Sequence, residues 1–518
     1  MSDNKKQWIK IIRANLTPPS LRDNSADVDR LISWIKKELG TKDVEMDFSF
    51  VRKIPGLLRK HQYRLKPVLY KKQSSWDLID ILSPQENETI FGLAMDLGTT
   101  TIVLRLLDLM KGDLKDEISF NNPQIEIGQD ILTRIHYAGQ EGGLERLQGI
   151  VIDRLNREIS GLIQKHGIGR DSIVGMVGAG NTTMTHLFLG LDPFSICREP
   201  YAPAINSPGQ IKAKKLGIEI NPGAPILMLP SVGSYFGGDL IAGILASGIN
   251  NQEEVSILVD VGTNAEVVIG NRDWLMACAG AAGPALEGGV AGMGMMAGPG
   301  VINMVNISPD TRELSIKTIG DNPPMGICGS GLIDLVAQLF LAGMIDLRGK
   351  FAPKNCNDYM RNIDGIKHFV VVRSQESATG KPLTLSQPEI DSLMRSKAAM
   401  YTILTTITNT AGIAWKEISN FYIAGTFGLY IDPKSAITIG MIPDLPLTTY
   451  KPLGNTSLAG AQKVLMSSDT RNEAKNIRDR ITYIELNVNQ EFMNNFSAAK
   501  FIPHTDRGLF PSVREYTF

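Results

Sequence analysis

Apolar and polar positions in the first 82 residues follow patterns that predict a small α+β unit. Residues 26–39 place apolar side chains at helical spacing, whereas residues 44–51 alternate strictly, as in a strand with one buried face. The Pro-Gly pair at 55–56 punctuates the chain and precedes a short basic helix. Two further strand-like runs follow at 63–70 and 76–82. These elements predict a small α+β domain at the N-terminal end.

Beyond the polar segment 83–88, the pattern changes to pairs of strands followed by helices. The clearest helix is predicted at 386–412, where Ser386 and Glu389 have the spacing of a capping box. The tail, residues 483–518, is mixed and is expected to pack on the main body. The predicted domains are 1–88, 89–255, 256–482 and the extension 483–518.

An internal repeat is the main signal of organisation. The sequences AMDLGTTT and LVDVGTNA share an aspartate between apolar residues, followed by Gly-Thr, and their aspartates are Asp96 and Asp260. Their separation is too long for a solenoid repeat. It suits two related α/β lobes that face each other across a cleft.

The residue types in this repeat suit the binding of a polyphosphate with a cation. Gly98 lets backbone N–H groups approach a ligand, and successive N–H groups can cradle a phosphate oxygen. Asp96 would repel a bare phosphate, but a carboxylate can hold hydrated Mg²⁺, in part through water. The alternative is an ordinary polar turn. The residues that the two copies supply are Asp96, Gly98, Thr99 and Thr100, and Asp260, Gly262, Thr263 and Asn264.

Three further segments place glycine and small polar residues at the ends of apolar runs. In 173–190 a strand meets a helix start, which favours either a simple N-cap or a phosphate near the helix N-terminus. In 421–432 a strand ends in glycines that suit a flat base, and in 326–345 small residues suggest two closely crossing helices. The residues singled out are Gly178, Asn181 and Thr182, then Gly329 and Ser330, and finally Gly425, Thr426 and Gly428.

Composition narrows the class of protein. The chain has 518 residues, 43% hydrophobic and 21% charged, so about two to four globular domains are expected. The net charge of -1 gives no reason to expect nucleic acid or a membrane as partner. The N-terminus has no signal-peptide apolar region, and the apolar tracts near 276–305 are interrupted, which predicts a cytoplasmic protein.

The four cysteines are far apart in the sequence, so we interpret them as reduced structural thiols. Zinc sites and iron–sulfur clusters use more closely spaced ligands. A cluster shared between two subunits is the alternative. The cysteines are Cys197, Cys278, Cys328 and Cys356.

Taken together, these motifs resemble the acetate and sugar kinase, Hsp70 and actin superfamily. Its phosphate 1, connect 1, phosphate 2, connect 2 and adenosine segments correspond in order to 94–101, 174–185, 257–266, 326–337 and 421–428. The resemblance implies an α/β fold with two ribonuclease-H-like lobes around an ATP cleft, preceded by the small α+β domain. It also implies ATP and Mg²⁺ as ligands, with the metal near Asp96 and Asp260.

Sequences between the motifs are similar to the reductive activators of corrinoid proteins, whose ATPase portion is a DUF4445-type domain. The similar segments are 16–31, 121–135, 231–245, 277–289, 423–443 and FMNNFSAAKFIPH near the C-terminus. Such activators bind a Co(II) corrinoid protein of a methyltransferase system and use ATP to drive its reduction to Co(I). The resemblance also implies a homodimer.

Two departures from that family change the expectations. Its members carry an N-terminal ferredoxin-like domain with a [2Fe–2S] cluster, and this sequence begins where their middle domain would begin. We therefore expect no iron–sulfur cluster in this chain and a separate low-potential electron donor; a truncated chain, or a role other than electron delivery, is the alternative. The loop 287–300, more polar in the family, has Gly292, Met293, Met295 and Met296, which suggest an adaptable corrinoid-facing surface or core packing.

Candidate catalytic bases for water attack on ATP are Asp130, Asp260 and Glu287, and each could instead be a surface or capping residue. Two other functions use the same cleft. A small-molecule kinase would phosphorylate a sugar, acid or polyol, and a non-redox ATP-gated factor would bind the corrinoid protein without delivering electrons.

Overall fold

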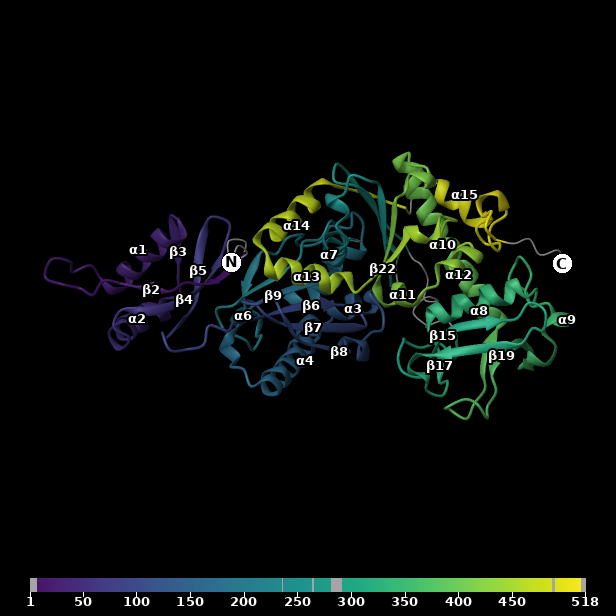
Figure 1. Ribbon diagram of the computed structural model, residues 1–518, viewed down its shortest axis with the longest axis horizontal. Helices are drawn as coiled ribbons and strands as arrows, with labels where there is room; N and C mark the ends of the chain where they lie inside the picture. The colour runs from purple at the N-terminus through teal and green to yellow at the C-terminus, as the bar shows by residue number, and fades with distance from the viewer. Residues whose placement is uncertain (1–6, 235, 263–264, 281–290, 487–489, 514–518) are drawn as a thin grey trace. The chain divides into compact units, whose positions relative to one another are not determined.

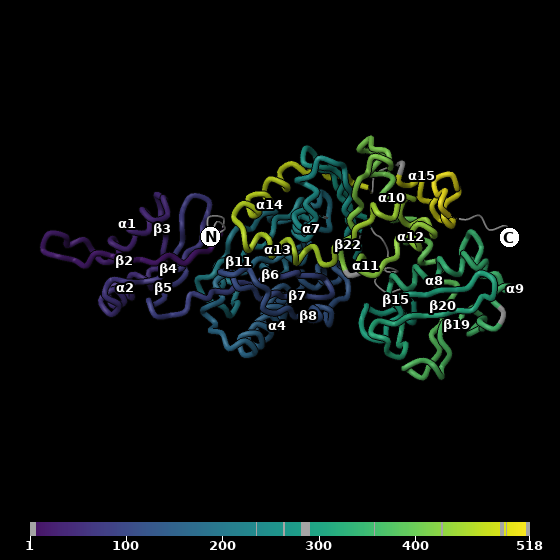
Figure 2. Tube along the Cα trace, in the orientation of Figure 1, coloured from purple at the N-terminus to yellow at the C-terminus, as the bar shows by residue number. Residues whose placement is uncertain are grey.

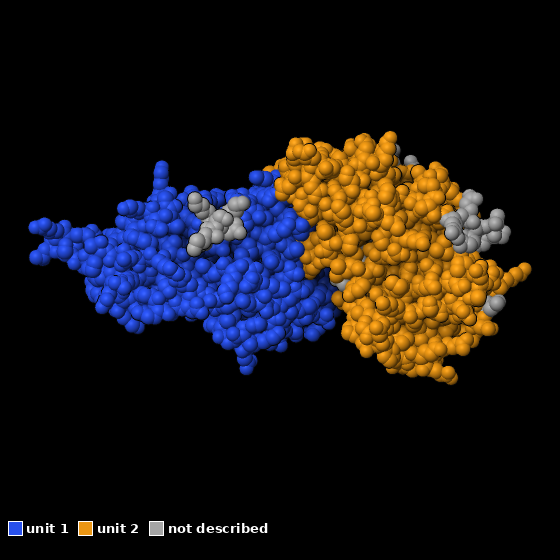
Figure 3. Space-filling model, in the orientation of Figure 1, with its two compact units in different colours: residues 1–246, 457–478 blue, residues 247–456, 479–518 orange. Residues whose placement is uncertain are grey.

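The chain forms two compact units, which are coloured separately in Figure 3. Unit 1 comprises residues 1–246 and 457–478, and unit 2 comprises residues 247–456 and 479–518. The computed structural model describes residues 7–234, 236–262, 265–280, 291–486 and 490–513.

Unit 1 begins with the predicted small α+β domain, whose sheet has the strand order β1-β4-β5-β3, with β2 paired to β4. Its apolar core includes Leu31, Ile35, Ile54 and Leu58. The predicted helix at 26–39 and the strands at 63–70 and 76–82 are confirmed. The elements are β1 (Ile9–Ile11), β2 (Ala14–Asn15), α1 (Asp27–Leu39), β3 (Asp43–Glu45), α2 (Phe48–Lys60), β4 (Arg64–Lys71) and β5 (Ser75–Leu82).

The prediction of a strand at 44–51 is wrong beyond its first residues. The chain turns into α2 at Phe48, because the Asp47 side chain accepts a hydrogen bond from the Ser49 N–H and caps the helix. Pro55 therefore lies inside α2, where burial of Ile54 and Leu58 on one helical face offsets its unfavourable effect. Tertiary packing overrides the local alternation of apolar residues here.

The main sheet of unit 1 has the order β10-β11-β9-β6-β7-β8 (Figure 1). Strands β6, β7 and β8 are antiparallel neighbours, and β9 runs parallel to both β6 and β11. The strands are β6 (Phe91–Leu97), β7 (Thr101–Asp108), β8 (Leu114–Asn121), β9 (Ile173–Gly180), β10 (Gln210–Lys212) and β11 (Pro225–Met228). The helices are α3 (Ile131–Ala138), α4 (Gly143–His166), α5 (Thr182–Leu189), α6 (Ala213–Leu216) and α7 (Gly238–Ser247).

Two helices from late in the sequence, α13 (Thr456–Met466) and α14 (Ser468–Arg480), pack in unit 1 beside α7 (Figure 2). Lys463 of α13 donates to the Leu245 carbonyl at 2.7 Å, and the Trp8 indole donates to the Val464 carbonyl at 2.9 Å. The predicted second lobe, 256–482, included these helices, whereas the structure places 457–478 in unit 1. No local pattern in the sequence indicated this, because the residues that contact the helices lie far away in the chain.

The main sheet of unit 2 has the order β22-β21-β12-β13-β14-β23. Its strands are β12 (Ser256–Val261), β13 (Ala265–Gly270), β14 (Leu275–Gly280), β21 (Asn420–Ala424), β22 (Tyr450–Gly454) and β23 (Ile481–Ile484). Two smaller sheets contain β15 (Val301–Ile307), β16 (Leu314–Thr318) and β17 (Gly326–Ile327), and β18 (Met360–Ile363), β19 (Ile366–Val372) and β20 (Leu383–Ser386). The helices are α8 (Gly329–Leu341), α9 (Pro353–Cys356), α10 (Gln387–Ala411), α11 (Gly425–Tyr430), α12 (Pro433–Thr438) and α15 (Gln490–Ala498).

The predicted helix at 386–412 is confirmed as α10, with the Ser386–Glu389 capping box. Among the residues that the structure describes, no helix is long and apolar enough to cross a membrane.

Both main sheets contain the same five-strand arrangement. Three antiparallel strands that are consecutive in sequence (β6–β8 and β12–β14) are extended, beside the first strand, by two parallel strands (β9 and β11, and β21 and β22). Asp96 is paired in register with Ala179 of β9, and Asp260 with Ala424 of β21. The sequence repeat is therefore a repeat of topology, and the predicted pair of ribonuclease-H-like α/β folds is confirmed.

Candidate functional site

The first candidate site lies where β6 ends in the turn 98–100. A Cβ atom at Gly98 would lie 2.4 Å from the Thr101 carbonyl oxygen, so only glycine fits this turn. Asp96 is half-buried just before the turn, and within the turn Thr99 is half-buried and Thr100 is exposed. The turn therefore presents backbone and hydroxyl groups beside a carboxylate.

Asn181 both caps a helix and contacts this turn. Its Oδ1 accepts from the Met184 N–H at 2.9 Å at the start of α5, and its Nδ2 donates to the Thr99 Oγ1 at 3.1 Å. Thr182 donates its hydroxyl to the Gly233 carbonyl and is buried. Gly178 lies inside β9, where a Cβ atom would meet the Met228 sulfur at 2.6 Å. Of these residues, Asn181 reaches the turn, whereas Gly178 and Thr182 serve packing.

Asp239, in the first turn of α7, is a further candidate residue, which the sequence did not predict. Its Oδ1 accepts from the Leu240 N–H at 2.9 Å. Burial, together with the negative charge of Asp96, raises the pKa of the Asp239 carboxyl to about 7. The sequence signal that could have indicated it is Gly-Gly-Asp at 237–239, directly before an apolar run. These residues lie in 231–245, which was noted only for its similarity to the corrinoid activators.

These residues lie at one end of the unit 1 sheet. A Cβ atom at Gly237 would lie 2.4 Å from the Asn181 Cα and 2.5 Å from the Asp239 Oδ1. Asp239 is thus adjacent to the start of α5, and its carboxyl interacts electrostatically with Asp96. Two carboxylates this close favour either a shared proton or a divalent cation, and oxygen ligands of this kind suit Mg²⁺.

In unit 2, Asp260 lies at the corresponding place near the end of β12. The neighbouring strand β21 runs into Gly425, which has a φ of 82° and whose Cβ atom, if present, would lie 3.3 Å from the Asp260 Oδ1. The phosphate 2 and adenosine segments therefore meet within this unit. Gly262 directly follows β12, while Thr426 and Gly428 lie in α11. The candidate residues Thr263, Asn264 and Glu287 are outside the described residues.

Gly329 and Ser330 begin α8, and both are buried. The Ser330 hydroxyl lies 3.1 Å from the Cys328 sulfur. A Cβ atom at Gly331 would lie 2.4 Å from the Ile302 carbonyl oxygen, so the close approach is between α8 and strand β15. The expected close crossing of two helices at these small residues is instead a helix–strand contact.

Asp130 is the N-cap of α3. Its carboxylate accepts from the Thr133 N–H at 2.9 Å and from the Thr133 hydroxyl at 2.6 Å. These hydrogen bonds lower the pKa of the Asp130 carboxyl, so the group is a weak base. The geometry favours the capping interpretation over the catalytic one.

We expect Asp130→Ala to lower the free energy of unfolding by about 1 kcal/mol, the usual cost of a lost N-cap. Asp130→Ser retains a capping oxygen and should keep both stability and the kcat of ATP hydrolysis close to wild type. Urea titration and steady-state kinetics measure the two quantities. A loss of kcat of about 100-fold in the serine variant would instead make Asp130 catalytic.

The methionines of the loop 287–300 differ in burial. Met293 is buried in the core of unit 2, whereas Met296 is 57% exposed. Met295 is half-buried against Gly326, and the Gly292 N–H donates to the Glu389 Oε1 at 2.5 Å. Core packing therefore explains Met293, and Met296 is the methionine that a partner could reach.

The cysteines occupy ordinary interior positions. Cys278, Cys328 and Cys356 are buried, Cys197 is half-buried, and all four are free thiols. Burial raises the pKa of the Cys278 thiol, and it raises that of Cys356 to about 11, so both are poor nucleophiles. Within the described ranges, no group of three or more His, Cys, Asp or Glu side chains is arranged to hold a metal ion.

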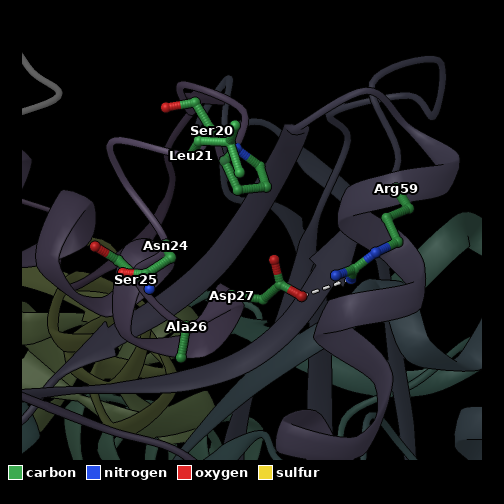
Figure 4. Close-up of a pocket in the computed structure, with 8 residues that line it drawn as sticks. Ser20, Leu21, Asn24, Ser25, Ala26, Asp27 and Arg59 are labelled. Atoms are coloured by element: carbon green, nitrogen blue, oxygen red, sulfur yellow. Dashed lines mark hydrogen bonds and ion pairs between the residues drawn. The ribbon is translucent and has the colours of Figure 1, made fainter.

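An open cavity of about 510 Å³ lies in the small N-terminal domain (Figure 4). The Asp27–Arg59 ion pair, with a distance of 2.5 Å, forms part of its wall. The lining residues are Pro19, Ser20, Leu21, Asn24, Ser25, Ala26, Asp27 and Arg59. All of them except Arg59 lie in 16–31, one of the segments similar to the corrinoid activators, and none belongs to the five nucleotide-binding segments.

Comparison with known proteins covers almost the whole chain. Three family models match, described as the RACo linker region (residues 6–88), the RACo middle region (91–252) and the C-terminal domain of RACo, the ASKHA domain (254–514). A corrinoid activation enzyme, RamQ of Eubacterium limosum, is 31% identical over 91% of this chain and 79% of its own length.

Two further relatives agree with these matches. The [Co(II) methylated amine-specific corrinoid protein] reductase of Methanosarcina barkeri is 24% identical over 79% of this chain and 76% of its own. A solved structure described as a reductive activator for corrinoid, iron-sulfur protein is 37% identical, with a TM-score of 0.90. The alignment covers 98% of this chain and 81% of that one.

Proposed function

Because the chain belongs to the RACo family of reductive activators, we propose that it activates a corrinoid protein by ATP-dependent reduction of Co(II) to Co(I). One observation carries this proposal: a relative named as a corrinoid activation enzyme matches 91% of the chain. The repeated Asp-Gly-Thr segments, one in each ribonuclease-H-like sheet, support it, because they would supply the groups that ATP and its metal require.

Within unit 1, the residues suited to Mg²⁺ are Asp96 and Asp239, since both are carboxylates at the same end of the sheet. Within unit 2, Asp260 has the matching position beside Gly425. Bound Mg²⁺ would neutralise charge on the phosphates during hydrolysis. The hydroxyls of Thr99 and Thr100 and the N–H groups of their turn would bind phosphate oxygens, and the glycines of 425–428 would admit the base.

Reduction of Co(II) to Co(I) is unfavourable for ordinary electron donors, so ATP must be coupled to a change of conformation. ATP can shift a conformational equilibrium only through different affinities for the two states. We propose that the state favoured by ATP is the one that receives the corrinoid protein, with Met296 in the contact surface. An exposed, flexible methionine suits a surface that adapts to a partner.

We further propose that the electrons come from a redox centre outside these 518 residues. Cys278, Cys328 and Cys356 are buried, and the high thiol pKa values of Cys278 and Cys356 disfavour the thiolate form that clusters need. A homodimer stays a prediction, which light scattering of the purified protein would check.

The proposal is tested by following the cobalt spectrum of a Co(II) corrinoid protein with an artificial low-potential reductant. Conversion to Co(I) that requires ATP and this protein supports reductive activation. ATP hydrolysis that never changes the cobalt spectrum, with any corrinoid partner, contradicts it and directs attention to small-molecule phosphorylation. Tight ATP-dependent binding of the corrinoid protein without reduction would identify a non-redox binding factor.

A further inference from the structure

The backbone carbonyls of the turn 98–100, here called the phosphate turn, accept hydrogen bonds from the segment 121–135. The Asn122 Nδ2 donates to the Gly98 carbonyl at 2.9 Å, and the Asn122 N–H donates to the Thr100 carbonyl at 2.8 Å. Arg134, in α3, donates from Nη2 to the Thr99 carbonyl at 2.7 Å. All three carbonyls of the turn are therefore bound from within unit 1.

This arrangement has a consequence for anion binding. Carbonyl oxygens repel phosphate, whereas backbone N–H groups attract it. The N–H and the carbonyl of one trans peptide point in opposite directions. Because the carbonyls of this turn are bound by Asn122 and Arg134, the N–H groups are left to face the ligand. The turn is thereby prepared for phosphate before the nucleotide arrives, which lowers the entropy cost of binding.

Arg134 is unusual because its charge is fully buried among neutral acceptors. Its side chain is 0% exposed. Besides the Thr99 carbonyl, it donates to the Gly128 carbonyl at 2.8 Å, the Gln124 Oε1 at 3.2 Å and the Met184 sulfur at 3.3 Å. Asp130, on the same helix, acts on it only through longer-range electrostatics.

Within the part of the chain that the structure describes, the hydrogen-bond acceptors of this guanidinium are all neutral, and its burial is costly because it removes hydration. Burial lowers the pKa of Arg134 to about 10, so the side chain still carries its charge at neutral pH. A polyphosphate bound at the turn would supply the missing negative charge close to this group. The cost of burial is thus offset most fully in the nucleotide-bound state.

We propose that Arg134 is a positioning residue of the ATP site, which fixes the phosphate turn through Thr99 and adds positive charge behind it. This inference rests on the proposed function, because it concerns the same nucleotide. Arg134 does not touch the ligand itself. Its effect should therefore depend on the phosphates of the ligand and not on the adenosine.

The test compares the affinities of Arg134→Lys and Arg134→Met for ATP, ADP and adenosine. We expect the Kd for ATP to rise about tenfold in the lysine variant and about 100-fold in the methionine variant, with a smaller rise for ADP. The Kd for adenosine should stay within about twofold of wild type. In steady-state hydrolysis, the KM for ATP should rise more than kcat falls.

Arg471 provides a matched control. It is also a buried arginine of unit 1, it donates to the Lys71 and Lys72 carbonyls, and burial lowers its pKa. Arg471→Lys should change the melting temperature without changing the ratio of the ATP and adenosine affinities. If Arg134→Met does not fold, the affinities of Arg134→Lys alone test the positioning role, because lysine keeps the charge and lacks the planar guanidinium.

The outcomes separate this inference from the proposed function. Unchanged ATP affinity in Arg134→Lys, or equal weakening of ATP and adenosine, overturns the positioning role and leaves ATP-dependent activation intact. Failure of the wild-type protein to bind ATP at all overturns the proposed function and this inference with it. Selective loss of affinity for ATP and ADP supports both.

Discussion

Replacement of Asp239 by asparagine should have opposite effects on activity and stability. We expect Asp239→Asn to reduce the kcat of ATP hydrolysis by about 100-fold or more, since it removes a charged group from the site beside Asp96. The same change should raise the free energy of unfolding of the metal-free protein. Asparagine keeps the oxygen that accepts from the Leu240 N–H and removes the repulsion between two carboxylates.

The sign of the pH dependence follows from the raised pKa of Asp239. The folded protein binds this proton more tightly than the unfolded chain, so the contribution to stability decreases as pH rises from about 4 through about 7. In Asp239→Asn this decrease should be absent. Urea titrations of wild type and variant across that range, without Mg²⁺, measure it.

Asp334 offers the matched comparison, since burial also raises the pKa of its carboxyl. It accepts from the Val305 N–H at 2.6 Å and from the Ser435 hydroxyl at 2.5 Å, and therefore connects α8, β15 and α12. Asp334→Asn should destabilise unit 2 by about 2 kcal/mol, because asparagine offers one acceptor in place of two. Loss of stability in both variants would contradict a strained carboxylate pair at Asp96 and Asp239.

The nucleotide motifs were predictable from sequence because each is a local signal. A strand, a Gly-containing turn and a second strand follow one another within about a dozen residues, and a hairpin needs no distant information. The repeat indicated two related lobes, and the resemblance to the actin-like superfamily implied the ribonuclease-H-like strand order of each lobe. Asp96 and Asp260 became candidates in this way, and Gly425 became one because it directly follows an apolar strand.

Asp239 was missed because its proximity to Asp96 depends on long-range pairing. It joins the site only when β9 lies between β6 and β11, which brings the start of α7 beside Asn181. The role of Arg134 was missed for the same reason, since it depends on α3 packing under the turn of a different hairpin. The position of α13 and α14 in unit 1 likewise has no local signal.

The incorrect strand at 44–51 has a different cause. Its alternation of apolar and polar residues is compatible with a strand, and a segment as short as these eight residues does not distinguish the strand period from the helix period well. Asp47 as a helix cap, with Ile54 and Leu58 at helical spacing, was the competing signal. In this segment the capping residue Asp47 indicated the structure better than the short alternation of apolar and polar residues.

Lys397 should be the residue on which the attachment of the C-terminal extension depends most. Its ammonium is fully buried on α10 and donates to the Phe501 carbonyl at 2.5 Å and the Pro503 carbonyl at 2.8 Å. Burial disfavours the charged form of Lys397 and lowers its pKa well below the ordinary value. No apolar side chain at this position could donate to the two carbonyls.

We expect Lys397→Met to lower the free energy of unfolding by about 3 kcal/mol, because two buried carbonyls lose their donor. Lys463→Met is the matched control, since that exposed lysine also donates to two carbonyls, of Leu245 and Ala246, and water can replace it. Its effect should stay below about 1 kcal/mol. Limited proteolysis should cut within 499–513 faster in Lys397→Met only. Equal effects of the two substitutions would show that the extension is held mainly by its apolar contacts, including Phe510 against Tyr401.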